Sequence, residues 1–239
     1  MDVQITRIGY TLCGFPRVLM QIHHDSRNFF LQGPAGKLEA ILWTPTRAGM
    51  PTLVAVLCHP HPLFGGTLHN KVVYQAAKSM DRLGIPVLRF NFRGAGLSAG
   101  EHDRGLGERG DVQAVIDFLA SEFSNIPLLV GGFSFGSWVG LRVGCADSRV
   151  QELIGLGIPV NSSDFTYLEN CPKPKLIVQG TNDQYGAWEK VEPVVAHMAG
   201  DTRIAFVQDA DHFFTGYLEK LDQAITTWLM DRHPELKKL

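Results

Sequence analysis

The segment that most constrains this chain joins an apolar run to a helical pattern through a serine flanked by glycines. Residues 127–130 are apolar, residues 131–136 read Gly-Gly-Phe-Ser-Phe-Gly, and apolar positions with helical spacing follow. This pattern predicts a strand, a sharp turn and a helix, with Ser134 at the turn. Glycine at positions 132 and 136 avoids a clash between side chains on either side of a strained residue. Because the helix N-terminus presents N–H groups beside the hydroxyl, the segment indicates a nucleophilic serine.

The composition of the 239 residues narrows the class of protein. The chain is 45% apolar and 19% charged with a net charge of −2, which argues against a nucleic-acid-binding surface. Four widely spaced cysteines form no Cys-x-x-Cys pair, as is typical of reduced thiols: Cys13, Cys58, Cys145 and Cys171. The sequence shows neither a secretory signal nor an apolar run long enough to span a membrane. We therefore expect a cytoplasmic protein with one domain, residues 1–239.

Strand patterns alternate with helical patterns along most of the chain. Expected strands cover residues 52–57, 85–92, 127–130, 153–158, 175–179 and 203–207, and strand patterns at 18–23, 29–31 and 38–44 precede them. Expected helices cover about 70–83, 110–119, 135–141, 187–198 and 218–229. This order predicts an α/β fold with a mostly parallel central sheet of about eight strands, flanked by helices on both faces. The first strands are expected to be antiparallel.

Three residues suited to nucleophilic catalysis each follow the end of an expected strand, namely Ser134, Asp183 and His212. Because the carboxyl ends of parallel strands meet at one edge of a sheet, we expect these side chains to lie together. His212 would take the serine proton and return it to the leaving group, while Asp183 orients the imidazole. Asp209 and Asp211 are closer to His212 in sequence, but a loop neighbour rarely faces the far ring nitrogen.

An oxyanion hole needs two backbone N–H groups directed at the developing charge. The N–H of Phe135 follows the nucleophile and is the first expected donor. The second is expected from the loop after residues 52–57, where the two prolines have no N–H to offer. Leu63 is the first choice for this second donor, and Phe64 is the alternative.

The substrate pocket is expected to be aromatic and open. Its candidate lining residues are Phe64, Phe133, Tyr185 and Phe213. The connector at residues 159–174 is too short for a helical cap domain, so we expect at most a short flap there.

Two further patterns offer alternative functions that the sequence does not favour. His59, His61 and His69 resemble metal ligands, but no carboxylate or cysteine completes a recognised spacing. We expect no metal, and we expect either His59 or His61 to form a hydrogen bond within the loop. The glycines of residues 93–100 lack the spacing of a dinucleotide loop, so we expect no cofactor and a loop near the floor of the site.

Together these motifs resemble those of the α/β-hydrolase superfamily. The motifs lie at residues 59–66, 91–98, 132–136, 180–183 and 211–212, and the resemblance covers about residue 38 to the C-terminus. The chain is similar to small, lid-poor bacterial esterases of the dienelactone-hydrolase-like group. Dienelactone hydrolases proper carry a cysteine nucleophile, whereas this chain has Ser134, which favours ordinary ester hydrolysis.

The resulting hypothesis is a carboxylesterase-type serine hydrolase that cleaves small or aromatic acyl esters through an acyl-enzyme intermediate. Thioesterase, lactonase and amidase activities use the same groups and stay open, as does a minor peroxide-dependent reaction of Ser134. A catalytically idle hydrolase fold that binds a partner is the alternative in a different class. Residues 1–32 fit either edge strands or a surface that packs on a second copy, so a homodimer is a further alternative.

Overall fold

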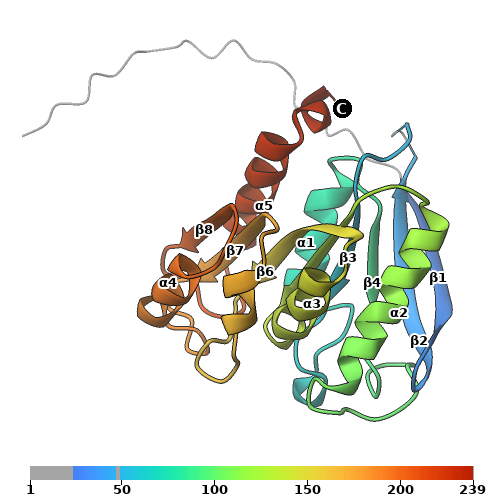
Figure 1. The fold of residues 1–239 in the computed structure, drawn as a ribbon, viewed down its shortest axis with the longest axis horizontal. Helices are drawn as coiled ribbons and strands as arrows, with labels where there is room; N and C mark the ends of the chain where they lie inside the picture. Colours follow the sequence, from blue (N-terminus) through green and yellow to red (C-terminus); the bar gives the residue numbers. More distant parts are fainter. Residues whose placement is uncertain (1–23, 47–48, 239) are drawn as a thin grey trace, which may run out of the picture.

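One eight-stranded sheet runs through residues 24–46 and 49–238, the part of the chain described by the structure, a computed structural model (Figure 1). Its strands are β1 (His24–Gly33), β2 (Gly36–Pro45), β3 (Val54–Cys58), β4 (Val87–Phe90), β5 (Leu128–Phe133), β6 (Val150–Leu156), β7 (Lys175–Gly180) and β8 (Thr202–Val207). Their spatial order is β1-β2-β4-β3-β5-β6-β7-β8. The β1–β2 and β2–β4 pairs are antiparallel and all others are parallel, which confirms the expected sheet.

Helices cover both faces of the sheet, as the alternating pattern predicts. They are α1 (Lys71–Asp81), α2 (Gly107–Glu122), α3 (Phe135–Ala146), α4 (Trp188–Ala196) and α5 (Leu218–Arg232). Buried residues of α2, α3 and α4 share one apolar cluster, and those of α1 and α5 share the other. In Figure 1, α2 and α3 lie in front of the sheet and α1 lies behind it. The sheet is therefore the middle layer between two cores.

The central strands are buried on both faces, and this determines where the site lies. Every residue of β3 and β5 is buried, as their continuous apolar sequences predict. Both strands are parallel and adjacent, so their carboxyl ends meet at the same edge. The loop after β3 and the turn after β5 therefore lie next to each other.

The connector at residues 159–174 contains little regular secondary structure. It contains one 3₁₀ turn, Thr166–Asn170, and no other helix or strand. The strand pattern at residues 18–23 lies outside the described residues. Among the described residues, no helix is long and apolar enough to cross a membrane.

Two tryptophans provide a test of where packing stabilises the fold. Trp228 on α5 is 2% exposed, whereas Trp188 at the start of α4 is 41% exposed. Truncating a buried aromatic residue removes apolar contacts and leaves a cavity. We expect Trp228→Ala to lower the free energy of unfolding by about 3–5 kcal/mol, measured by urea denaturation. The matched Trp188→Ala should cost less than about 1 kcal/mol. Equal losses in the two variants would contradict the assignment of Trp228 to the core.

Candidate active site

Ser134 occupies a strained turn between β5 and α3. Its φ of 54° and ψ of −122° lie in a region that non-glycine residues rarely adopt. Its backbone N–H donates to the carbonyl of Leu156 at the end of β6, over 2.9 Å. Its carbonyl accepts from Ser137 N–H, also over 2.9 Å, in the first turn of α3. Strand, neighbouring strand and helix together hold the strained residue in place.

The flanking glycines are needed because of backbone contacts. A Cβ at Gly132 would lie 2.3 Å from the carbonyl oxygen of Gly136. A Cβ at Gly136 would lie 2.4 Å from the carbonyl oxygens of both Cys58 and His59. The expected clash between two side chains is thus replaced by clashes with main chain. The first turn of α3 consequently packs directly against the end of β3.

The structure brings Ser134, His212 and Asp183 into one chain of hydrogen bonds. His212 Nε2 lies 2.9 Å from Ser134 Oγ, and His212 Nδ1 lies 2.7 Å from Asp183 Oδ2. The side chains of His212 and Asp183 are 3% and 0% exposed. Because a carboxylate only accepts, Nδ1 carries the ring proton, and Nε2 is left to accept from the serine hydroxyl.

Asp183 is held by donors other than the histidine. The backbone N–H groups of Tyr185 and Gly186 donate to Oδ1 over 2.8 and 3.1 Å. Gln179 Nε2 donates to Oδ2 over 2.8 Å, and Gln179 Oε1 accepts from Ile158 N–H. Gln179 was not among the predicted site residues, because its only signal in the sequence is a polar residue at the end of an apolar strand.

The loop after β3 uses the N–H groups that were expected in the oxyanion hole. Leu63 N–H donates to His61 Nδ1 over 3.3 Å, and Phe64 N–H donates to the His61 carbonyl over 3.1 Å. By contrast, the N–H groups of His61 and Phe135 have no hydrogen-bond acceptor among the described residues. The 3₁₀ turn Pro62–Phe64 explains why these N–H groups differ, since the N–H groups that follow His61 donate within the turn.

His59 has a structural role in the same loop. It is fully buried, its Nε2 accepts from Phe92 N–H over 3.0 Å, and its Nδ1 donates to the Pro60 carbonyl over 2.6 Å. Burial lowers the pKa of His59 to about 4. Both ring nitrogens are engaged, so His59 has no lone pair to offer a metal ion.

A cavity of about 220 Å³ opens beside Ser134 and His212. Its lining residues come from four loops and the start of α3: Pro60, His61, Phe64, Gly65, Gly66, Asn70, Ser134, Phe135, Pro159, Ser162, Ser163, Tyr185, His212 and Phe213. None of these side chains is a lysine, arginine, aspartate or glutamate. Asn70, Ser162 and Ser163 were not among the predicted pocket residues, because no sequence motif around them marks a binding site.

The aromatic residues expected in the pocket have different positions. Phe64, Tyr185 and Phe213 lie on its wall. Phe133 does not, because it is fully buried with its ring 4.9 Å from that of His212. The loop at residues 93–100 also contributes no lining residue, contrary to its expected place near the floor.

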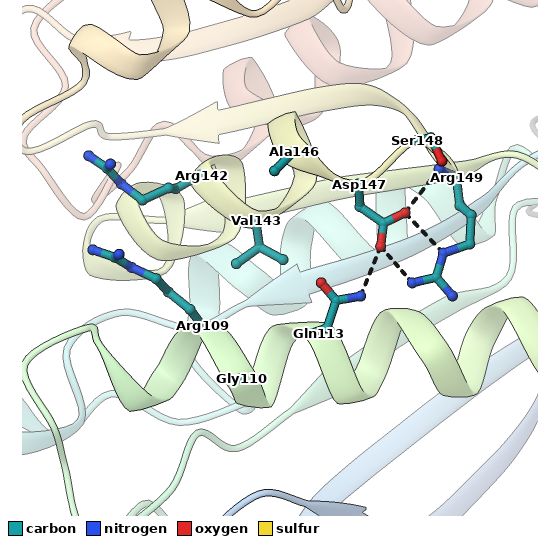
Figure 2. Close-up of a pocket in the computed structure, with 9 residues that line it drawn as sticks. All are labelled: Arg109, Gly110, Gln113, Arg142, Val143, Ala146, Asp147, Ser148 and Arg149. Carbon is teal, nitrogen blue, oxygen red and sulfur yellow. Dashed lines mark hydrogen bonds and ion pairs between the residues drawn. The ribbon is translucent and has the colours of Figure 1, made fainter.

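A larger surface groove lies elsewhere, between α2 and α3 (Figure 2). It measures about 710 Å³ and is rich in arginine. Gln113 on α2 hydrogen-bonds to Asp147 across it, and Arg149, two residues from Asp147, holds the pKa of that carboxyl well below its usual range. Its lining contains no residue of the Ser134 cavity, so the two sites are separate.

Comparison with known proteins now defines the family. Residues 56–227 match a family described as an alpha/beta hydrolase domain. The chain belongs to this α/β-hydrolase family. An uncharacterised protein from Rickettsia prowazekii is 35% identical over 212 residues, which cover 84% of this chain and 87% of that protein.

Two solved structures are similar to the α/β hydrolase over most of its length. An α/β serine hydrolase without a lid from Xanthomonas campestris is 32% identical, with a TM-score of 0.80 and coverage of 87% of this chain and 94% of that one. A serine hydrolase homologue from Coxiella burnetii is 37% identical, with a TM-score of 0.80 and coverage of 85% and 97%. The resemblance to small, lid-poor α/β hydrolases is therefore confirmed.

Because His59 is buried with a lowered pKa, we expect the folded chain to lose stability in mild acid. Its pKa is about 4 in the folded chain, against an ordinary value of 6.5. Between these values the unfolded chain binds a proton that the folded chain does not, so stability falls with falling pH, by up to about 3 kcal/mol. We expect His59→Asn to be less stable than wild type at neutral pH. Its free energy of unfolding, measured by chemical denaturation, should fall less than that of wild type between about pH 7 and about pH 4.5.

The control for this experiment is the exposed His69, whose His69→Asn variant should keep the wild-type pH dependence. Parallel pH profiles for wild type and His59→Asn would show that His59 does not cause the acid sensitivity.

Proposed function

We propose that this α/β hydrolase is a carboxylesterase in which Ser134, His212 and Asp183 form the catalytic triad. The observation that carries the proposal is the pair of hydrogen bonds of 2.9 and 2.7 Å that joins the three side chains at the wall of a cavity. Such a chain is the arrangement that turns a serine hydroxyl into a nucleophile.

The reaction would proceed in two halves. Ser134 Oγ attacks the ester carbonyl while His212 Nε2 takes the hydroxyl proton. The tetrahedral intermediate collapses when His212 returns this proton to the departing alcohol, leaving an acyl group on Ser134. Water then repeats the same steps and releases the acid. Asp183 orients the imidazole and stabilises its protonated form throughout, so the chemistry requires neither a metal nor an organic cofactor.

The oxyanion would be bound by the backbone N–H groups of Phe135 and His61. Neither group has an acceptor in the part of the chain that the structure describes, whereas the N–H groups of Leu63 and Phe64 are used within their own turn. The contact of Gly136 with the carbonyls of Cys58 and His59 brings the two segments together. Phe135 also begins α3, where the helix dipole favours a negative charge.

The cavity favours small, neutral acyl groups. A volume of about 220 Å³ is small for a ligand pocket, and its described lining residues include no lysine, arginine, aspartate or glutamate. The short connector at 159–174, with Pro159, Ser162 and Ser163 lining the cavity, supports an open site like that of the lid-free hydrolase from Xanthomonas campestris. Thioesters, lactones and amides are alternatives that the same groups could attack, and a panel of these substrates distinguishes them.

Removal of the nucleophile is the direct test of this function. We expect Ser134→Ala to abolish hydrolysis of short p-nitrophenyl esters and labelling by a fluorophosphonate. Asp183→Asn should lower kcat by about 10³- to 10⁴-fold, because the histidine would lose its orienting acceptor. Asp211→Asn is the matched control, since Asp211 accepts from Thr215 N–H and not from His212. Wild-type protein that shows neither turnover nor labelling would instead favour a catalytically idle binding protein.

Proline substitution tests the two candidate oxyanion donors. His61 has a φ of −54°, which proline can adopt, and its N–H donates to no acceptor among the residues that the structure describes. We expect His61→Pro to lower kcat on p-nitrophenyl acetate by about 10²-fold or more relative to His61→Ala, which lacks the ring but keeps the N–H. If His61→Pro and His61→Ala have the same kcat, His61 is not the donor, and the assignment returns to Leu63 or Phe64.

A further inference from the structure

The triad geometry determines the side of Ser134 on which the alcohol part of a substrate lies. This inference rests on the proposed esterase function. The departing alcohol oxygen receives its proton from His212 Nε2, so it must lie within hydrogen-bond reach of that atom. The oxyanion lies on the opposite side, towards the loop after β3. In the sheet order, β3 lies on one side of β5, and β7 and β8 lie on the other.

Two aromatic rings flank His212 on the alcohol side. The ring centroid of Tyr185 lies 4.6 Å from that of His212, and the centroid of Phe213 lies 5.2 Å away at an interplanar angle of 82°. Both residues line the Ser134 cavity. They come from the loops that follow β7 and β8, and they remain 47% and 40% exposed.

Hydrogen bonds hold the backbone that carries both rings. Tyr185 N–H donates to Asp183, and its carbonyl accepts from Asn161 N–H over 3.1 Å. In the sequence, Phe213 stands between the buried residues His212 and Phe214. The N–H of Phe214 donates to the Asp211 carbonyl over 3.0 Å. A ligand that contacts these rings therefore does not have to order the backbone of their loops first.

The geometry points to an alcohol-binding site formed by Tyr185 and Phe213, which selects esters of aromatic alcohols. A flat apolar group attached to the ester oxygen would extend from His212 towards the mouth of the cavity and lie against both rings there. Aromatic rings attract one another in stacked and edge-to-face arrangements, and the half-exposed rings would lose contact with water. The uncharged lining offers no partner for an ionised alcohol group.

The test compares substrates that differ in the alcohol part. Benzyl acetate and ethyl acetate share an acyl group and have alcohols of similar acidity, so their chemical steps are comparable. We expect kcat/KM to favour benzyl acetate by about tenfold or more. Phe213→Ala and Tyr185→Ala should each reduce this preference by about two- to tenfold. Phe30→Ala, which removes a comparably exposed ring on β1, should leave the preference unchanged.

Three outcomes separate this inference from the proposed function. A preference below about twofold, with rapid fluorophosphonate labelling of Ser134, would overturn the alcohol site and leave the esterase intact. Variants that affect ethyl phenylacetate more than benzyl acetate would place the acyl part on these rings and also overturn it. Failure of both labelling and ethyl acetate hydrolysis in wild type would reject the proposed function itself. Labelling rates of the variants show whether they retain a folded site.

Discussion

The candidate site depends on the close approach of the first turn of α3 to the main chain at the end of β3. Only glycine at position 136 permits this approach, because any Cβ there would overlap the carbonyl oxygens of Cys58 and His59. On the other side, Ser134 N–H donates to Leu156 at the end of β6. The strained serine is therefore fixed by the strands on both sides of β5. The same approach brings together the N–H groups of His61 and Phe135, which have no acceptor within residues 24–46 and 49–238.

The second requirement is a buried carboxylate, Asp183, whose oxygens both accept hydrogen bonds. An unpaired buried charge costs several kcal/mol, so each donor to Asp183 contributes to the stability of the folded site. Its two oxygens accept from His212, Gln179 and the N–H groups of Tyr185 and Gly186. Asp183 is thus held from several directions and fixes His212 in turn. This explains why a residue distant in sequence, rather than a loop neighbour, orients the ring.

The sequence predicted the features that depend on local patterns. Continuous apolar runs identified the buried parallel strands, and the Gly132 and Gly136 spacing identified the turn at Ser134. The positions of Ser134, Asp183 and His212 after the ends of parallel strands were sufficient to predict that they meet, because the carboxyl ends of parallel strands share an edge. These inferences needed no knowledge of side-chain packing.

The features that the sequence did not predict depend on contacts between loops or on the direction of one side chain. Phe133 was expected in the pocket, but a strand buried on both faces gives no alternation from which its direction could be read. Leu63 and Phe64 have N–H groups, but the turn that begins at His61 uses both. Gln179 was missed because its function arises only when β7 lies beside the loop that carries Ile158.

The absence of a large lid gives the substrate itself a part in preparing the site. In many enzymes a lid excludes water and so strengthens electrostatic interactions within the site. Among the described residues, Tyr185 and Phe213 pack against His212 on the proposed alcohol side, and both are still half exposed. An apolar alcohol group lying on these rings would displace water from the mouth of the cavity while the ester bond is being cleaved. A small polar alcohol would leave that water in place, so selectivity and catalysis would be improved by the same contact.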